Sequence, residues 1–326
     1  MNDDGELRTI CLGEAGAVFK PRGHDAIVQF VRIAVVVNVE KFRGKGVAAA
    51  MSLAFLRINV YSHSDSVEPI GQNQRVGTAT SASSSLRQMS PIILLPPSEG
   101  KAEGGTPGTH WSVDEGPLGE LAPQRKQVIA ALRANGGGSQ KLLGVNGAHL
   151  ERAQRANSTL LKSPILPAWQ RYTGVVWDHL DLASLPAAVK KSALTSLLVP
   201  SGLAGVVRAI DALPDYRLKM GARLDDLGTM SAFWRESVSA IVRAYAKKRP
   251  VLDLLTIEHR AVFADRTAFI EVNFLAKTGK AIGHDAKATK GLLARHVLVT
   301  LADGATLDDA LRSFRSPTLT LKVTRL

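Results

Sequence analysis

The sequence predicts an α/β domain of the mixed α+β type, in which helices flank a mixed central sheet. Short apolar runs at 91–97, 194–201 and 251–256 end at proline or polar residues, as buried strands do. Residues 269–275 and 319–325 alternate apolar and polar side chains, which is typical of half-buried strands. Segments of helical spacing separate the strands without a strict βαβ rhythm, so we expect a mixed sheet.

Helices are expected between these strands. Residues 121–135 carry apolar side chains at helical spacing, and a run of glycines that starts at Gly136 ends the segment. Thr306 and Asp309 have the spacing of a capping pair at the start of another helix. The remaining helices are expected at 165–185, 231–247, 287–301 and 306–314.

The first 88 residues read unlike the rest of the chain. Residues 62–87 are polar, rich in Ser, Thr and Gly, and aperiodic, which indicates a disordered segment. The acidic extreme N-terminus does not fit a secretory signal. Two interpretations remain: a short appended element, or a stretch upstream of a true start at Met89. We favour the second because a buried-strand pattern follows Met89 at once, and we expect one domain over 89–326 after a poorly ordered extension over 1–88.

Composition limits the classes of function. The chain has 326 residues, 45% of them hydrophobic, and no apolar run near the roughly 20 residues of a membrane span, so we expect no membrane partner. A single cysteine, Cys11, excludes internal disulfides and fits a reducing compartment, so we expect the cytoplasm. The net charge is +12, and residues 89–326 hold 31 Lys and Arg against 21 Asp and Glu. This excess favours nucleic acid as a partner, although general basicity of a GC-rich bacterial protein explains it equally well.

The loop after the first predicted strand, PPSEGK, raises the question of phosphate binding. It is not a P-loop, because Leu95 stands where the first glycine should be and Ala102 follows the lysine. Lys101 nevertheless follows the carboxyl end of a strand, where open sheets bind ligands. It is either a phosphate ligand or a solvated surface lysine.

Residues 201–224 combine glycines and charges in a way that suggests a shaped loop. Arg208, Tyr216 and Arg217 are its candidate binding residues. The alternative is that Arg208 and Arg217 simply pair with Asp211 and Asp215.

Two lysines lie near a predicted helix start further on. Lys287 and Lys290 would oppose the helix dipole there unless an anion lies nearby. The cost of that opposition is small, a few tenths of a kcal/mol, so the indication of an anion site is weak.

The stretch LLGVNGAHLERA (142–153) reads as a helix-hairpin-helix-like turn that opens a helix. In such elements the turn presents backbone N–H groups to a DNA phosphate, because glycine permits close approach and the helix start favours negative charge. An ordinary helix end at Gly144 and a turn at Asn146 explain the pattern almost as well. The candidate DNA-binding residues of this element are Lys141, Gly144, Asn146, Gly147, Arg152 and Arg155.

Together these stretches resemble the YaaA family of bacterial peroxide stress proteins, over essentially all of 89–326. The likeness rests on ILLPPSEGK (93–101), YTGVVWDHL (172–180), SGLAGVVRAIDALPDYRLKMG (201–221), FW (233–234), VLDLLTIEHRAVF (251–263) and KATKGLLARH (287–296). The resemblance implies resistance to hydrogen peroxide, limitation of damage from free iron, and DNA binding through a basic cleft and a helix-hairpin-helix-like element.

The resemblance also bears on single residues. Lys101, Arg208, Tyr216, Arg217 and Arg295 match family positions, as do Gly202, Gly205 and Gly221, and Lys290 stands where other members have Arg. The first loop of the family often reads S-P-A-K-T, so Glu99 is an acidic departure that puts simple anion binding there in doubt. Glu258 matches only loosely.

Two functions from different classes are therefore expected. The first is a stress protein that binds double-stranded DNA largely independently of sequence, because no recognition-helix signature is present. The second is an enzyme acting on an acidic or nucleotide-like substrate, such as a small phosphate-bearing ligand, in the cleft around Lys101 and Arg217. We expect a monomer. We also expect no metal or cofactor, because the six histidines of 89–326 are scattered. Any effect on iron is then indirect.

Overall fold

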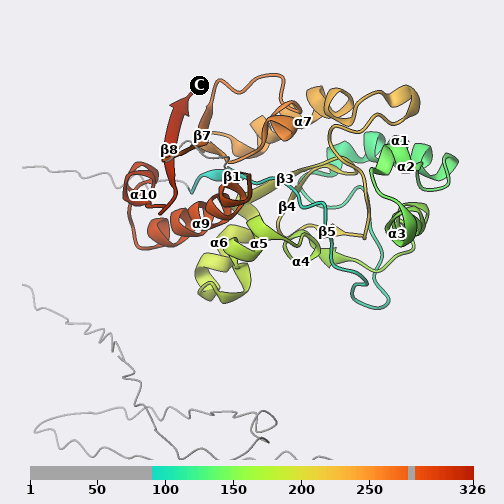
Figure 1. Ribbon diagram of the computed structural model, residues 1–326, viewed down its shortest axis with the longest axis horizontal. Helices are drawn as coiled ribbons and strands as arrows, with labels where there is room; N and C mark the ends of the chain where they lie inside the picture. Colours follow the sequence, from blue (N-terminus) through green and yellow to red (C-terminus); the bar gives the residue numbers. More distant parts are fainter. Residues whose placement is uncertain (1–89, 278–282) are drawn as a thin grey trace, which may run out of the picture. The chain divides into compact units, whose positions relative to one another are not determined.

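The computed structural model describes residues 90–277 and 283–326 (Figure 1). The predictions made for residues 1–88 and for a start at Met89 lie outside this part of the chain. No helix within it has both the length and the apolar composition needed to cross a membrane.

A six-stranded sheet forms the centre of the fold, in the order β4-β3-β1-β6-β7-β8. Strands β3, β1, β6 and β7 run parallel, whereas β4 and β8 pair antiparallel at the two edges. A small second sheet joins β2 to β5. The strands are β1 (Ile92–Leu94), β2 (Leu166–Pro167), β3 (Leu197–Ser201), β4 (Gly205–Arg208), β5 (Ala212–Leu213), β6 (Val251–Asp253), β7 (Phe269–Ala276) and β8 (Leu319–Arg325). The predicted mixed α/β fold is confirmed.

Helices lie around the sheet, as Figure 1 shows. They are α1 (Ala122–Ala134), α2 (Gln140–Leu143), α3 (Gly147–Ser158), α4 (Ala168–Arg171), α5 (Val175–Leu180), α6 (Ala187–Ser196), α7 (Met230–Ala246), α8 (Ile257–Arg260), α9 (Gly283–Ala302) and α10 (Leu307–Ser313). Short 3-10 helices cover Gly119–Leu121, Leu182–Ser184 and Asp225–Leu227. At α10, the Thr306 side chain and Asp309 form the expected capping box.

Among the differences from the predicted element bounds, two have a clear physical reason. The single helix expected at 165–185 is divided into α4 and α5, because Gly174 adopts a φ of 101°, which no helix accommodates. The strand expected at 194–201 begins only at Leu197, since α6 continues through Ser196. In both places an apolar pattern continues across a change of backbone conformation, and side-chain hydrophobicity alone does not mark that change.

The parallel strands determine where a site can form. Strands β1, β3 and β6 are entirely buried, which explains why their sequences are continuous apolar runs rather than alternating ones. Leu94 of β1 pairs with Asp253 of β6, so the loops that follow these two strands leave the sheet side by side. Such a position, outside the carboxyl ends of parallel strands, is where ligands bind in open α/β sheets.

Candidate functional site

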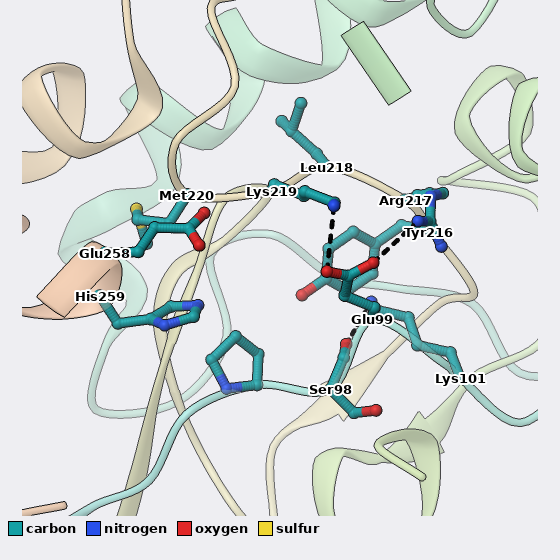
Figure 2. Close-up of a pocket in the computed structure, with 11 residues that line it drawn as sticks. Ser98, Glu99, Lys101, Tyr216, Arg217, Leu218, Lys219, Met220, Glu258 and His259 are labelled. Atoms are coloured by element: carbon teal, nitrogen blue, oxygen red, sulfur yellow. Dashed lines mark hydrogen bonds and ion pairs between the residues drawn. The ribbon is translucent and has the colours of Figure 1, made fainter. Parts of the chain in front are cut away.

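A pocket of about 50 Å³ lies between the loop after β1, the chain segment after β5 and the start of α8. Figure 2 shows the charged side chains of the three segments lying around this space. Its lining residues are Pro97, Ser98, Glu99, Lys101, Tyr216, Arg217, Leu218, Lys219, Met220, Glu258 and His259. The structure thus brings together three of the predicted site residues, Lys101, Tyr216 and Arg217.

Lys101 borders the pocket with its amine. The Nζ atom donates a hydrogen bond to the Ser98 carbonyl at 3.0 Å and lies 4.2 Å from the centre of the Tyr216 ring. Burial lowers the pKa of Lys101 to about 7, because the charged form loses water, and the neighbouring Asp215 opposes this only in part. Lys101 is thus half-buried, and its amine lies against an aromatic ring, which is not the environment of a freely solvated lysine.

A chain of buried hydroxyl groups lies beneath this amine. The Tyr172 and Tyr216 hydroxyls are 2.8 Å apart, and Ser201 Oγ is 2.8 Å from the Tyr216 hydroxyl. Ser201 Oγ also accepts a hydrogen bond from the Ala204 N–H at 3.1 Å. Burial raises the pKa of Tyr216 to about 12, so the phenol stays neutral and offers Lys101 an aromatic face without a negative charge.

The loop that carries Lys101 also holds a carboxylate between two cations. Glu99 Oε2 lies 3.0 Å from Arg217 Nη2, and Glu99 Oε1 lies 3.0 Å from Lys219 Nζ. Burial acts to raise the pKa of Glu99, but Lys219 and Arg217 outweigh it and hold the pKa below its usual value. The acidic departure noted in the sequence thus lies in contact with the basic residues expected to bind an anion.

Arg217 connects this pocket to the α2–α3 hairpin. Its Nε donates to the Leu143 carbonyl at 2.9 Å, and its backbone N–H donates to Asn157 Oδ1 at 2.9 Å. The fully buried Asn157 also donates to the carbonyls of Gly137 and Arg217. The sequence reading missed Asn157, since an amide within a helical segment gives no sign of such long-range partners.

Two glycines in the left-handed region border the turn between α2 and α3. Helix α2 ends at Gly144 with φ 62°, and α3 begins at Gly147 with φ 53° after Asn146, whose side chain makes no capping hydrogen bond. The turn borders a shallow surface concavity, lined by Gln140, Lys141, Gly144, Val145 and Asn146. Lys141 and Arg155 are exposed on the two helices.

Arg152 has internal partners instead of a free guanidinium. It donates to Asp215 Oδ2 at 2.9 and 3.2 Å, lies 3.0 Å from Glu103, and donates to the Lys101 carbonyl at 2.9 Å. The expected pairing of Arg217 with Asp215 is therefore wrong, because Arg152 occupies Asp215. The expected pairing of Arg208 with Asp211 is confirmed, at 2.6 Å.

The remaining predicted residues lie outside the pocket lining. Arg208 lies in edge strand β4 and Lys287 is exposed on α9. Arg295 donates to the Leu180 and Asp181 carbonyls at 3.0 and 2.7 Å, where a cation complements the carboxyl end of α5.

Lys290 is buried two turns into α9, so it does not oppose the dipole at the helix start. Its Nζ donates to the carbonyls of Leu254 and Leu255 at 2.5 and 2.7 Å. Burial lowers its pKa to about 8. Lys290 thus fixes the chain between β6 and α8, which carries one wall of the pocket.

Comparison with known proteins decides the family. A profile described as peroxide stress protein YaaA matches residues 92–322. The chain belongs to the peroxide stress protein YaaA family. A UPF0246 protein of Streptomyces coelicolor is 40% identical over 220 residues, which cover 64% of this chain and 83% of that protein. A UPF0246 protein of Corynebacterium glutamicum is 32% identical over 229 residues, covering 68% of this chain and 90% of that protein.

The matched YaaA region includes both the pocket and the hairpin. It also includes the α8 wall, where Glu258 Oε1 accepts the Gly221 N–H at 3.0 Å and His259 Nδ1 lies 2.7 Å from Thr256 Oγ1. Burial lowers the pKa of His259 to about 4, so its imidazole is neutral near pH 7. This side of the YaaA pocket therefore presents one carboxylate and one neutral ring, facing the cations of the opposite side.

Proposed function

We propose that this YaaA-family protein acts in peroxide stress by binding double-stranded DNA through its phosphates, largely independently of base sequence. The α2–α3 hairpin carries this proposal. The first N–H groups of a helix have no intrahelical partner, and the Asn146 side chain does not cap those of α3. Gly147 and Ala148, which follow Asn146, are exposed, so a phosphate oxygen has access to the start of the helix.

Basic side chains surround this turn. Lys141 is exposed on α2, Arg155 is exposed on α3, and the Nζ of Lys219 lies 3.8 Å from the position of a Cβ on Gly144. A Cβ at position 144 would thus be in van der Waals contact with the Lys219 amine, which shows that Lys219 lies next to the turn. These cations suit the neutralisation of neighbouring backbone phosphates, which supplies most of non-specific DNA affinity.

The same binding offers a physical route to limiting damage from free iron. DNA holds a condensed layer of cations, and a protein that neutralises phosphates releases part of that layer. Divalent iron held at the backbone would be released with it, so peroxide would meet less iron at the DNA. In this proposal the protein acts on iron through DNA and not by binding the metal.

Fluorescence anisotropy of a labelled duplex across a salt series tests the DNA proposal. We expect binding that weakens linearly with log salt concentration. The double variant Lys141→Ala/Arg155→Ala should lower the slope by roughly 2, because each lost phosphate contact contributes about 0.9. Lys191→Ala, which removes an exposed lysine from α6, is the matched control and should leave the slope unchanged. No binding at low salt, or equal slopes for the two variants, would contradict the proposal.

An enzyme acting on an acidic or phosphate-bearing small molecule is the second candidate function. The half-buried Lys101 amine favours it, because it borders the pocket together with Arg217 and Lys219, and a partly desolvated lysine beside other cations is a recurring catalytic arrangement. The pocket volume of about 50 Å³ favours a ligand of few heavy atoms over a nucleotide.

A thermal-shift titration tests this second function. Inorganic phosphate at millimolar concentration should raise the Tm of the protein, because a ligand that binds only the folded state stabilises it. Lys101→Ala should remove most of that rise, whereas Lys191→Ala should keep it. A rise of equal size in both variants would place the anion elsewhere.

A further inference from the structure

We propose that Lys101 is a nucleophilic amine that forms an imine with a small oxo acid, whose carboxylate takes the place of the Glu99 carboxylate between Arg217 and Lys219. The inference rests on the second proposed function, an enzyme acting at this pocket. It adds the class of substrate and the covalent step.

The protein satisfies only part of the hydrogen-bonding capacity of the Lys101 amine. Within residues 90–277 and 283–326, Lys101 Nζ makes one hydrogen bond, to the Ser98 carbonyl, and no carboxylate lies within ion-pair distance of it. The two acidic groups that act on it electrostatically are already paired, Asp215 with Arg152 and Glu99 with Arg217. The amine therefore borders the pocket with hydrogen-bonding capacity that the protein leaves unused.

The pocket already contains a carboxylate, that of Glu99. Glu99 occupies the position between two cations that a carboxylate ligand would need, with both contacts at 3.0 Å. Its side chain is 63% exposed, so it can leave for water at little cost. Since Glu99 and Lys101 line the same small pocket, a ligand carboxylate bound in place of Glu99 leaves its adjacent carbonyl group within the space that the amine borders.

The Lys101 amine suits imine formation with the carbonyl group of an oxo acid. The lone pair of the neutral amine forms a C–N bond to the carbonyl carbon, and the carbonyl oxygen takes up a proton. The C–O bond of the resulting carbinolamine then breaks. One water leaves, and in the net balance both of its hydrogens come from the amine nitrogen. The step needs no oxidant or reductant, and buried lysines beside cations form such imines in other enzymes.

The charges facing the amine determine the pH at which it reacts. Burial, Arg217 and Arg171 disfavour the ammonium form, whereas Asp215 and Glu99 favour it. The other charged or titratable groups around the amine and the pocket are Arg152, Tyr172, Tyr216, Lys219, Glu258 and His259. The balance puts the pKa of Lys101 at about 7. An exposed lysine titrates near 10.4, so about one in a thousand such amines is neutral at pH 7.5.

Reductive trapping tests the proposal. The full chain is incubated with glyoxylate and cyanoborohydride, and the modified lysines are located by peptide mass spectrometry. We expect Lys101 to be labelled at least about tenfold faster than exposed lysines at pH 7.5. Its rate should level off above about pH 8, whereas the rate of an exposed lysine should rise about tenfold per pH unit up to pH 9.

Matched variants separate the two parts of the proposal. Lys101→Arg should abolish the fast label, because a guanidinium does not form the imine, and Lys191→Arg should change nothing. Glu99→Gln should accelerate labelling of Lys101 at least about threefold, because a neutral amide binds Arg217 and Lys219 more weakly than the carboxylate and yields its place more easily to the ligand. Labelling of Lys101 no faster than that of exposed lysines would overturn the imine. If the imine failed but phosphate raised the Tm of the protein and not that of Lys101→Ala, the proposed enzyme function would stand without the imine. If phosphate gave no such difference, the enzyme function and the imine would both fail.

Discussion

Replacing Arg171 with methionine is expected to lower the free energy of unfolding by about 3–5 kcal/mol. Arg171 is fully buried and its guanidinium binds only carbonyl groups. It donates to Leu213 O at 3.2 Å, to Gly104 O at 2.9 Å and to Pro164 O at 3.2 Å, and it also hydrogen-bonds the Ala102 carbonyl. Methionine fills much of the volume but leaves these acceptors without a donor. Because Gly104 is exposed, water can bind its carbonyl in the variant. The loss of stability is therefore smaller than the sum expected for four unsatisfied carbonyl groups.

The position of these acceptors extends the effect to the pocket. Ala102 and Gly104 lie one and three residues after Lys101, and the Arg171 carbonyl also accepts the Ala102 N–H at 2.9 Å. Both the backbone carbonyl and the guanidinium of Arg171 therefore form hydrogen bonds with the loop that carries Lys101. We expect the variant to lose the fast labelling of Lys101 as well as stability.

Urea unfolding and thermal melts measure the change, with Arg133→Met as the control. Arg133 is exposed on α1, so its replacement should alter stability by less than about 0.5 kcal/mol. For a domain of this size the Arg171 variant should melt roughly 6–20 °C lower. A drop similar to that of the control would show that the carbonyls find water or other donors without loss.

The elements of this fold follow from local patterns, whereas the site depends on distant pairings. Helices such as α7 and α10 and the alternating strand β7 lie where side-chain periodicity predicts them, because one face of each element must be buried. The interruption at Gly174 could not be predicted, since a glycine within an apolar pattern does not reveal its φ.

The ion pairs of the site also could not be predicted from local sequence patterns. Glu99 and Arg217 are 118 positions apart, and Arg217 follows β5, which belongs to a different sheet from β1, so only the tertiary fold brings the two side chains together. Composition could place Arg217 in a loop of unusual charge density, but Asp215 was the nearer partner in sequence and Arg152 holds it. Arg171 gave no signal, because a single arginine at the end of a short helix is usually solvated. The predictions from sequence also did not include the pair of Asp253 and Arg260, although a carboxylate inside an apolar run needs a partner and Arg260 follows seven residues later.

That buried pair leads to the second large prediction: Arg260→Met should destabilise the protein by about 3–5 kcal/mol, because it leaves a buried carboxylate without its partner. Asp253 is completely buried, and Arg260 Nε lies 2.8 Å from its Oδ2. The same guanidinium donates to Glu271 and Asn273 at 3.0 and 2.9 Å. Arg266 lies 3.7 Å from Asp253 and is already paired with Glu271, so it cannot replace Arg260 without moving.

A double-mutant cycle with Asp253→Asn distinguishes a lost charge pair from lost packing. If the unpaired charge dominates, Arg260→Met should cost at least about 1 kcal/mol less when Asp253 is already Asn. Additive costs in urea unfolding would instead assign the loss to packing. Asparagine keeps an oxygen for the Leu255 N–H, which Asp253 Oδ1 accepts at 2.8 Å. Because the Leu255 carbonyl in turn binds Lys290, the double variant should retain the chain segment that leads into α8, and with it the wall of the pocket that carries Glu258 and His259.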